Sequence, residues 1–401
     1  MYYHWKNLEL VLNNYKIPFN KPFLSGRETK YIIDAVNSGK ISGNGLYTQK
    51  CHQFLTENYN FRKVLLTTSC TDALEMAAIL ADIKPGDEVI IPSYTFVSTA
   101  LAFIRQGAHI VFADSSATNP NLDVEKVEEL ITSRTKAIVP VHYAGVACDM
   151  DRLMILAEQY HLLVIEDAAQ AINSFYKGRP LGSIGHLAAF SFHETKNIIA
   201  GEGGMLVIND ERFTKRAEII WEKGTNRSEF FRGEVNKYGW VDIGSSFLPS
   251  EIISAFLYAQ LENLDQIQSR RIAIWNHYHQ ALLPLSLAGH IQLPYLPDYA
   301  TNNAHMFYLL CQNIEERSIL IDVLKENGIL AVFHYLSLHE SDYYRAKHDG
   351  RELAYSDSYT NCLIRLPLFY ELTFAEIDQI VAVINNIYQS RHYAEAVNHN
   401  H

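Results

Sequence analysis

Four groups of side chains in this sequence have the types and the spacing of a catalytic site, although each also has an ordinary structural explanation. Lys196, in SFHETKNIIAGEGG, precedes a glycine-rich turn, and a partly desolvated lysine amine could attack a carbonyl. Asp167 ends the apolar run VIED, where a carboxylate is costly unless it is paired with a cation or a protonated ring nitrogen. The ordinary alternatives are a solvated loop lysine and a structural ion pair.

The other two groups follow the ends of expected strands. The run Ser69-Cys70-Thr71-Asp72 leads into a helix, and a hydroxyl beside free N–H groups at a helix N-terminus can bind phosphate. Phe96, in PSYTFVSTA, could stack on a flat ring. A plain helix cap and a core aromatic are the alternatives. Together, the phosphate cradle, carboxylate, amine and aromatic plate are the parts that pyridoxal phosphate requires, since a lysine holds this cofactor and an aspartate keeps its ring nitrogen protonated.

Alternating apolar and helical segments predict a sheet that would bring these groups together. Strands are expected over residues 63–69, 88–94, 109–114, 136–143, 161–168, 187–193 and 204–210. Helices are expected over residues 71–83, 97–106, 124–132 and 151–160. Near-continuous apolar strands that alternate with helices are typical of a mainly parallel sheet flanked by helices, with ligands at the carboxyl ends of the strands.

The two ends of the chain differ from this regular part. The run SGRE at 25–28 predicts a capping box, and Gly39 stands where such a helix would stop. Residues 224–247 lack periodicity and predict a long loop, and one helix is expected over 249–280. The segments that follow have an α+β pattern, with helices near 316–327 and 374–389, after a boundary marked by Pro284, Pro294 and Pro297. We expect an N-terminal extension and arm (1–24), a large domain (25–265) and a smaller C-terminal α+β domain (266–401).

The composition excludes several classes of protein. The 401 residues carry 34 basic and 45 acidic side chains, a net charge of −11 that disfavours nucleic acid as a partner. Five spaced cysteines without a CxxC pair and the lack of an apolar stretch at the N-terminus indicate a cytoplasmic protein without a signal peptide. No apolar run reaches the roughly 18 residues of a membrane helix. His399 and His401 could bind a stray metal, but a frayed tail is the better interpretation, and no metal site is expected.

Several long segments resemble the DegT/DnrJ/EryC1/StrS family of sugar aminotransferases. They are PGDEVIIPSYTFVSTA, VPVHYAG, VIEDAAQ, SFHETKNIIAGEGG and RLPLFY, in this order. The resemblance covers about residues 17–385 and implies a fold-type I, pyridoxal-phosphate-dependent transferase. It also implies a homodimer with the site at the interface. Dehydratases of the same family have histidine at the position of Lys196, so the lysine favours transamination.

The resemblance implies a role for each site residue. Lys196 would form the Schiff base, Asp167 would pair with the ring nitrogen and Gln170 with the ring hydroxyl. The remaining contacts would be stacking by Phe96, phosphate binding by Thr71, the Asp72 backbone and Ser191, and a place beside the ring for His193. A further phosphate contact comes from a GYNYR segment of the partner subunit in this family. Here that segment is GSSFL, so Ser246 replaces the usual asparagine and Leu248 the usual arginine.

Further segments are similar to family members that use glutamate to aminate C4 of dTDP-4-keto-6-deoxyglucose. The product is dTDP-4-amino-4,6-dideoxygalactose, for enterobacterial common antigen. Among these segments are EKGTNRSEFFRGEVNKY and NAHMFY. Candidates for positive partners of the nucleotide diphosphate are Arg227, Arg232, His305 and His334. The alternatives are an aminotransferase for another nucleotide keto sugar and a non-catalytic protein of this fold. A nicotinamide-dependent enzyme is disfavoured, because no GxGxxG follows the first strands.

Overall fold

The computed structural model describes residues 15–398, with side chains through residue 389. The expected N-terminal extension is therefore described only from residue 15, and His399 and His401 lie outside the described residues. All five cysteines are free thiols. None of the helices in the described residues is both long enough and apolar enough to cross a membrane.

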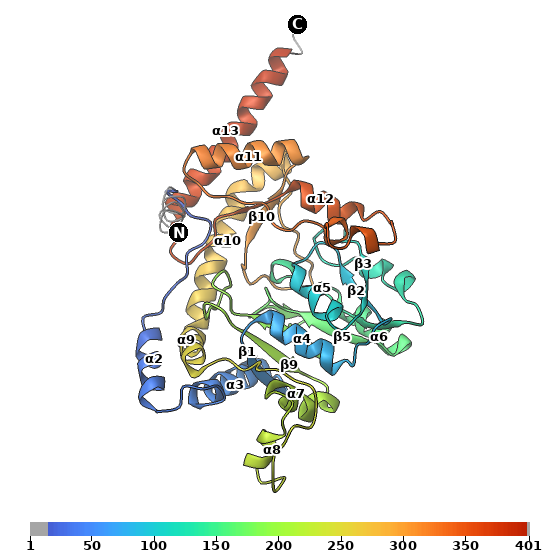
Figure 1. Cartoon of the computed structure of the whole chain (residues 1–401). Helices are drawn as coiled ribbons and strands as arrows, with labels where there is room; N and C mark the ends of the chain where they lie inside the picture. Colours follow the sequence, from blue (N-terminus) through green and yellow to red (C-terminus); the bar gives the residue numbers. More distant parts are fainter. Residues whose placement is uncertain (1–14, 399–401) are drawn as a thin grey trace, which may run out of the picture.

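A seven-stranded sheet lies at the centre of the larger part of the molecule (Figure 1). Its strands are β1 (Lys63–Thr67), β2 (Glu88–Pro92), β3 (His109–Ala113), β4 (Thr135–Ile138), β5 (Leu163–Asp167), β8 (Leu187–Ser191) and β9 (Gly204–Ile208). Their order in the sheet is β1-β9-β8-β5-β4-β2-β3. The pairs from β3 across to β8 are parallel, whereas β9 runs antiparallel to both its neighbours. The predicted mainly parallel sheet is confirmed, with one reversed strand at the β8–β9 turn that carries Lys196.

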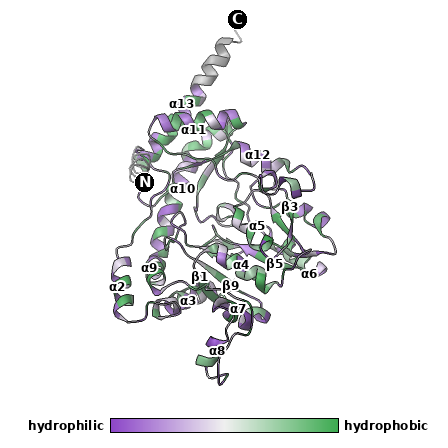
Figure 2. Cartoon of the chain, in the orientation of Figure 1, coloured by the Kyte–Doolittle hydropathy of each residue, from purple (hydrophilic) through white to green (hydrophobic). Residues whose placement is uncertain are grey.

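Helices cover both faces of this sheet, as the apolar strands require. Successive strand residues enter two different cores: Val164 packs on one face and Ile165 on the other. The helices α4 (Cys70–Leu80), α5 (Val97–Ile104) and α7 (Thr214–Trp221) belong to one core, while α6 (Met150–Tyr160) and α9 (Glu251–Leu261) belong to the other. Figure 2 shows the hydrophobic colour concentrated in the central strands.

The C-terminal part has its own small sheet and core. The strands β10 (Phe307–Leu310) and β11 (Leu363–Leu366) pair antiparallel, and they pack with the helices α10 (Leu264–Leu287), α11 (Ile314–Glu326) and α13 (Phe374–Asn398). The first turn of α10 contributes Leu264 and Ile267 to a core of the large sheet, and its later turns contribute to the C-terminal core. The domain boundary near residue 265 stays a prediction, because α10 contributes to the core of the large sheet as well as to the C-terminal core.

Two predicted helices and one predicted boundary marker differ from the structure. Residues 124–132 form two short 3-10 turns, because Asp123 caps the first at the Glu125 N–H (3.2 Å) and Ile131 already has extended backbone leading to β4. The helix expected over 249–280 is broken after α9, where the Asn263 side chain donates to the Ala259 carbonyl (2.8 Å). Pro284 lies inside the last turns of α10 instead of marking a boundary.

The N-terminal helix and the long loop over 224–247 also differ from the predictions in detail. Helix α2 (Glu28–Asn37) begins after Arg27, and the Glu28 carboxylate accepts from the Ser25 N–H (2.7 Å), so only half of the predicted capping box forms. Gly39 follows the helix end with φ of +73°, as expected. The predicted loop over 224–247 contains one short helix, α8 (Arg227–Phe231), which projects from the end of the molecule opposite α13 (Figure 1).

Candidate active site

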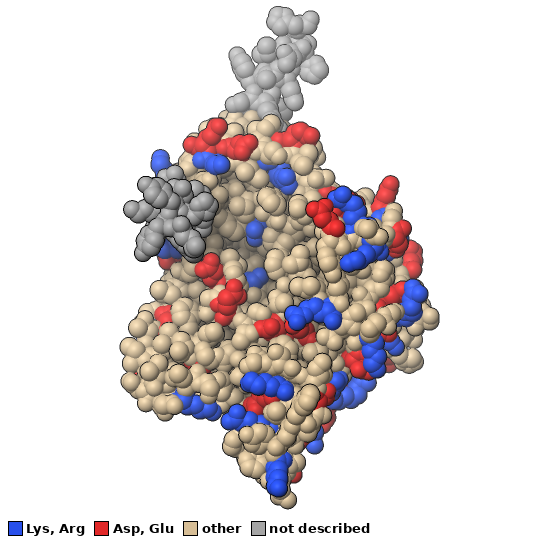
Figure 3. All heavy atoms as spheres, in the orientation of Figure 1, with Lys and Arg blue, Asp and Glu red and all other residues tan. Residues whose placement is uncertain are grey.

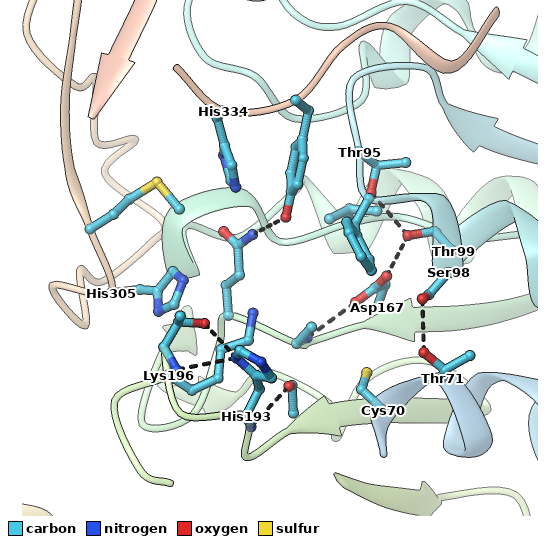
Figure 4. Close-up of a pocket in the computed structure, with 18 of the residues that line it drawn as sticks. Cys70, Thr71, Thr95, Ser98, Thr99, Asp167, His193, Lys196, His305 and His334 are labelled. Carbon is cyan, nitrogen blue, oxygen red and sulfur yellow. Dashed lines mark hydrogen bonds between the residues drawn. The ribbon is translucent and has the colours of Figure 1, made fainter. Parts of the chain in front are cut away.

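A cavity of about 560 Å³ lies at the carboxyl ends of the parallel strands, and it collects most of the predicted site residues (Figure 4). Both parts of the chain line it, since β11 contributes side chains opposite those of β5, α4 and α5. The predicted residues that line the cavity are Thr71, Phe96, Asp167, Gln170, Ser191, His193, Lys196, His305 and His334. Those outside it are Asp72, Arg227, Arg232 and Ser246.

Asp167 is a buried carboxylate without a cationic partner among the described residues. It is the last residue of β5, and its two oxygens accept from the Thr99 hydroxyl (2.7 Å) and from the Ala169 N–H (3.1 Å). Burial raises the pKa of this carboxyl, and these two hydrogen bonds and the charge of Lys196 only partly oppose it. The structural ion pair considered as an alternative is not formed, and a protonated ring nitrogen would supply the missing cation.

Lys196 lies in the β8–β9 turn and is partly buried in the cavity wall (Figure 4). Its N–H donates to the His193 carbonyl (2.9 Å), which fixes the turn. Burial lowers the pKa of the amine, Cys70 and Asp167 act in the opposite direction, and Arg365 lowers it further. A loop lysine in full contact with water would lack this desolvation, so the amine fits a nucleophile or a proton carrier better than a solvated charge.

The start of helix α4 has the geometry of a phosphate cradle. The Thr71 hydroxyl lies 2.8 Å from the Ser98 hydroxyl of α5, so two helix starts present hydroxyls to one place (Figure 4). The N–H groups of Cys70 and Thr71 precede the first backbone bond of the helix, from the Ala73 N–H to the Ser69 carbonyl (3.2 Å). The Asp72 N–H instead donates to the Ser69 hydroxyl (3.1 Å). The Asp72 N–H, which was predicted to bind the phosphate, therefore already donates to the residue that caps the helix.

Gly204 is a glycine that brings this helix start close to the sheet. A Cβ atom at this first residue of β9 would lie 2.4 Å from the Ser69 carbonyl carbon and 2.5 Å from the Cys70 nitrogen. Any side chain would push the cradle away from β9. The glycine-rich run after Lys196 thus positions the cradle as well as the lysine.

Gln170 is held by two neighbours that the sequence did not reveal. Its oxygen accepts from the Ala144 N–H (2.6 Å), and its amide nitrogen donates to the Tyr335 hydroxyl (3.0 Å). The second hydrogen of that amide nitrogen remains for a ligand. Ser191, at the end of β8, accepts from the His193 N–H (3.3 Å), and the His193 ring lies 3.7 Å from Glu202, which also lines the cavity.

His305 and His334 line the cavity as neutral rings and not as positive charges. His305 Nδ1 lies 2.9 Å from Asn197 Oδ1, while the Asn197 amide nitrogen donates elsewhere, so Nδ1 carries the proton and Nε2 is free to accept. His334 Nδ1 pairs with the Tyr143 hydroxyl (2.7 Å). Burial lowers the pKa of both rings well below the usual value. They can bind a substrate hydroxyl, but they supply no charge to a diphosphate.

The two predicted arginines lie elsewhere, in a second cavity of about 780 Å³ between α8 and α3 (Leu46–Tyr59). Arg232 is paired with Glu218 (2.9 Å) and Glu234 (2.7 Å), and the Arg227 guanidinium lies 5.2 Å from the Phe231 ring centre. Ser246 is exposed and pairs with Glu222 in an isolated bridge. One chain alone does not bring these three residues to the cavity that holds Lys196.

Sequence reasoning missed several residues that line this cavity, among them Ser98, Thr99, Tyr335 and Arg365. Thr99 stands one helical turn after Phe96, a spacing that could have suggested it. Arg365 opens the segment RLPLFY, which carried the family resemblance without an assigned role. Tyr335 comes from a segment 165 residues beyond Gln170, and no local pattern relates the two.

Comparisons with known proteins place the fold and the sequence among sugar aminotransferases. The model of the DegT/DnrJ/EryC1/StrS aminotransferase family matches residues 23–385. The spore coat polysaccharide biosynthesis protein SpsC of Bacillus subtilis (strain 168) is 32% identical over 386 residues, which cover 93% of this chain and 97% of that protein. The PMP form of the putative sugar aminotransferase Spr1654 from Streptococcus pneumoniae superposes with a TM-score of 0.86 at 26% identity, covering 94% and 100% of the two chains. S. venezuelae DesV, solved with a ketimine intermediate, gives 0.83 at 29% identity, covering 92% and 98%.

Proposed function

Since the chain belongs to the DegT/DnrJ/EryC1/StrS aminotransferase family and is a pyridoxal-phosphate-dependent sugar aminotransferase, we propose that it aminates C4 of dTDP-4-keto-6-deoxyglucose with glutamate as the donor. The product would be dTDP-4-amino-4,6-dideoxygalactose, for a cell-surface polysaccharide of the enterobacterial common antigen type. The observation that carries the chemistry is that one cavity holds both Lys196, whose pKa is lowered by burial, and the buried, unpaired Asp167. The sugar rests on the sequence segments around 222–238 and 303–308.

The residues of the cavity fit the cofactor. Pyridoxal phosphate supplies a protonated ring that withdraws electrons from the reacting carbon. Asp167 would hold the proton on its ring nitrogen, and the ring hydroxyl would take the remaining Gln170 amide hydrogen. Thr71, Ser98 and the N–H groups at the start of α4 would hold the phosphate. Phe96 is 54% exposed, so its ring is free to cover a flat ligand.

Lys196 would serve as the proton carrier of the reaction. A general base must give up its own proton near working pH and then return one, and burial moves the pKa of this amine toward that range. The neighbouring His305 Nε2 is free to accept a hydrogen bond, so it could orient a substrate hydroxyl without competing for the proton. Lys196 would thus transfer the proton, and His305 would orient the substrate.

We also propose that the enzyme works as a homodimer, in which the partner completes the nucleotide site. Arg227 and Arg232, the candidate partners of the diphosphate, lie outside the cavity of their own chain, and so does Ser246, to which the resemblance gives a phosphate contact. The segment around them is unusually apolar for a surface, with Phe231 at 69% and Trp240 at 86% exposure. Such side chains are typical of a surface that a second copy covers.

The test is turnover with glutamate and a panel of dTDP-keto sugars, with the product identified by NMR. We expect dTDP-4-keto-6-deoxyglucose to give an axial amine at C4. An equatorial C4 amine, or an amine at C3, would overturn the proposed substrate while leaving the aminotransferase chemistry intact. The matched control is Lys196→Ala, which should give no product with any sugar of the panel.

A further inference from the structure

A network of buried amides fixes which ring nitrogen of His305 carries the proton. The Asn303 backbone carbonyl, which can only accept, lies 2.8 Å from the Asn197 amide nitrogen and 3.2 Å from the Gln268 amide nitrogen. The Asn197 amide nitrogen also donates to Gln268 Oε1 (2.7 Å), so Asn197 Oδ1 is left to face His305 Nδ1 at 2.9 Å. Because that oxygen accepts, Nδ1 holds the hydrogen and Nε2 keeps a lone pair. Both amide side chains are buried, so the network is held away from solvent.

Separate contacts fix the backbone that carries this ring. Arg271 is almost fully buried, and it donates to the carbonyls of Ala304 (3.1 Å) and His305 (2.8 Å). The Asn303 side-chain oxygen accepts from the His305 N–H (3.0 Å), and its amide nitrogen donates to the Gln170 carbonyl (2.8 Å). Ala304 has left-handed backbone with φ of +50°, which persists in a non-glycine residue only where the surroundings enforce it. A strained residue and a buried arginine beside one histidine are typical of a functional site that requires a defined position.

The other neutral histidine of the cavity wall has no such network. His334 Nδ1 lies 2.7 Å from the Tyr143 hydroxyl, which can donate or accept, so this contact imposes neither tautomer. For His305, burial and then the charges of Lys196 and two arginines hold the pKa well below its usual value. Figure 3 shows basic side chains inside the central hollow of the molecule. His305 therefore presents to the cavity an uncharged nitrogen that accepts and does not donate.

The hydrogen-bond donor for His305 Nε2 must come from a substrate. Among the described residues, none donates to this nitrogen. The cofactor offers two hydrogens on its ring, and Asp167 and Gln170 are placed to bind the ring nitrogen and the ring hydroxyl. The carboxylates of glutamate only accept. His305 lies beside Lys196, whose charge acts on its ring (Figure 4), so the remaining donor is a hydroxyl of the sugar close to its reacting carbon.

We propose that Asn197 and Gln268 are positioning residues that hold His305 in the Nδ1–H tautomer, so that its Nε2 accepts from the hydroxyl next to the reacting carbonyl of the sugar. This inference rests on the proposed function, because it requires a keto sugar as substrate, and it names the group that the site selects. In dTDP-4-keto-6-deoxyglucose the carbon C5 carries no hydroxyl, so the donor is the 3-hydroxyl. The other tautomer would present an N–H, which any carbonyl or carboxylate oxygen could accept, and the selection for a hydroxyl would be lost.

The first test removes the hydroxyl from the sugar and the acceptor from the protein in turn. Stopped-flow absorbance of the cofactor measures the half-reaction with the sugar separately from the half-reaction with glutamate. With the parent, the 3-deoxy sugar should react about 30-fold more slowly, the scale for leaving a buried acceptor unpaired, whereas the 2-deoxy sugar should react within about threefold of the normal rate. His305→Leu should lose about 30-fold with the normal sugar and nothing further with the 3-deoxy sugar. His305→Gln can offer its amide oxygen instead, so it should recover most of the rate.

Two further variants test the positioning residues. Asn197→Leu removes the acceptor of the Nδ1 hydrogen and should slow the sugar half-reaction about tenfold, with no further loss when it is combined with His305→Leu, because it acts through the ring. Gln268→Met leaves the Asn303 carbonyl in place and should cost about threefold. Glutamate should load the cofactor within about threefold of the parent rate in every variant, which also shows that each one is folded.

The tautomer can be observed directly in the cofactor-free protein. In an NMR spectrum that correlates the ring nitrogens and carbon-bound hydrogens of ¹⁵N-labelled histidine, His305 is assigned by its absence from His305→Gln. We expect the Nδ1–H pattern in the parent and a mixture of both tautomers in Asn197→Leu. Asn209→Leu is the matched control, since the Asn209 amide also donates to two backbone carbonyls, at 2.8 Å each, but does not line the cavity. It should keep the parent spectrum and the parent rate with the sugar.

The inference is overturned if the 3-deoxy sugar reacts as fast as the normal sugar, if the glutamate half-reaction slows as much as the sugar half-reaction, or if Asn197→Leu keeps the parent tautomer. These outcomes are distinguishable from a failure of the proposed sugar. If the panel identifies another keto sugar, the sugar assignment is wrong, and the analogue of that sugar without the hydroxyl next to its carbonyl decides the role of His305. If dTDP-4-keto-6-deoxyglucose is aminated at C4 but parent and His305→Leu react alike, the sugar assignment is supported and the role of His305 is wrong.

Discussion

Two neighbouring carboxylates on strand β5 face opposite sides of the sheet and have opposite surroundings. Glu166 is fully buried, lies 2.9 Å from His142 Nε2 and accepts from the N–H groups of Gly182 (2.7 Å), Ile184 (2.8 Å) and Gly185 (2.6 Å). Asp167 has one hydroxyl and one N–H donor and opens into the active-site cavity.

The pKa of each carboxyl reflects this difference. Burial raises the pKa of both groups. For Glu166 the hydrogen bonds from His142 and from the backbone outweigh burial, and its pKa is lowered overall; for Asp167 they do not, and its pKa stays raised. Removing a buried charge that has a full set of partners is costly to the fold, whereas a buried charge without a counter-ion is typical of a functional site.

The largest effect should come from Lys196, whose amine lines the same cavity as Asp167. For Lys196→Ala we expect turnover to fall by about 10⁴-fold, since one side chain provides both the attachment of the cofactor and the proton transfer. The absorbance of the lysine-bound cofactor should disappear, while the circular dichroism spectrum is retained. Full turnover by this variant would remove the catalytic role of the site.

The next largest effect should be on the free energy of unfolding, when the charge of Glu166 is removed. Glu166→Gln should lower the free energy of unfolding by about 3–5 kcal/mol, because three N–H donors and His142 lose their common charged acceptor. Urea unfolding of the cofactor-free protein measures it. The rate per folded molecule should be nearly unchanged, so a variant that kept its stability but lost its rate would place Glu166 in the active site instead.

The stability that Glu166 provides should depend on pH in a defined direction. Its pKa is lowered on folding, so the contribution is fully present above the pKa of the unfolded chain, about 4.3, and is lost as pH falls through the lower folded value. The difference in unfolding free energy between the parent and Glu166→Gln should therefore shrink in acid. A difference that grew as the pH fell would contradict the lowered pKa.

The smallest effect should come from an arginine that is already paired. Arg232→Gln breaks contacts with Glu218 and Glu234 near the surface, and we expect about 0.5–1 kcal/mol of lost stability. If the partner subunit places Arg232 near the nucleotide, the KM for the sugar should also rise severalfold while glutamate loads the cofactor normally. Arg212→Gln, another exposed arginine paired with an aspartate, is the control with no expected change in KM.

Most of the large sheet could be predicted from the sequence, because strands buried on both faces are nearly continuous apolar runs. The apolar run that ends in Asp167 and the glycine-rich turn after Lys196 are both local patterns, and together they predict that these two residues share one site. The break at Asn263 and the 3-10 turns after Asp123 escaped prediction, since single side chains that bond to nearby backbone decide them.

The opposite wall of the cavity could not be predicted in the same way. Tyr335 and Arg365 meet residues far from them in the chain, and nothing in their local sequence tells a satisfied arginine from an unsatisfied one. Likewise, the pattern that marked Asp167 marks Glu166 equally well, and only the direction of each side chain distinguishes them. The position of the proton on the His305 ring is set by Asn197, which is 108 residues away.

The central claim is that Asp167 is left without a cationic partner by its own chain and that the cofactor supplies one. The most direct measurement is the melting temperature of Asp167→Asn beside the parent protein, without and with pyridoxal phosphate. Without the cofactor, we expect the variant to be as stable as the parent or more stable, because an unpaired buried charge has been removed. With the cofactor, we expect most of the stabilisation seen in the parent to be missing. A variant that is much less stable without the cofactor, but gains as much from it as the parent does, would show that Asp167 is a structural residue and contradict the claim.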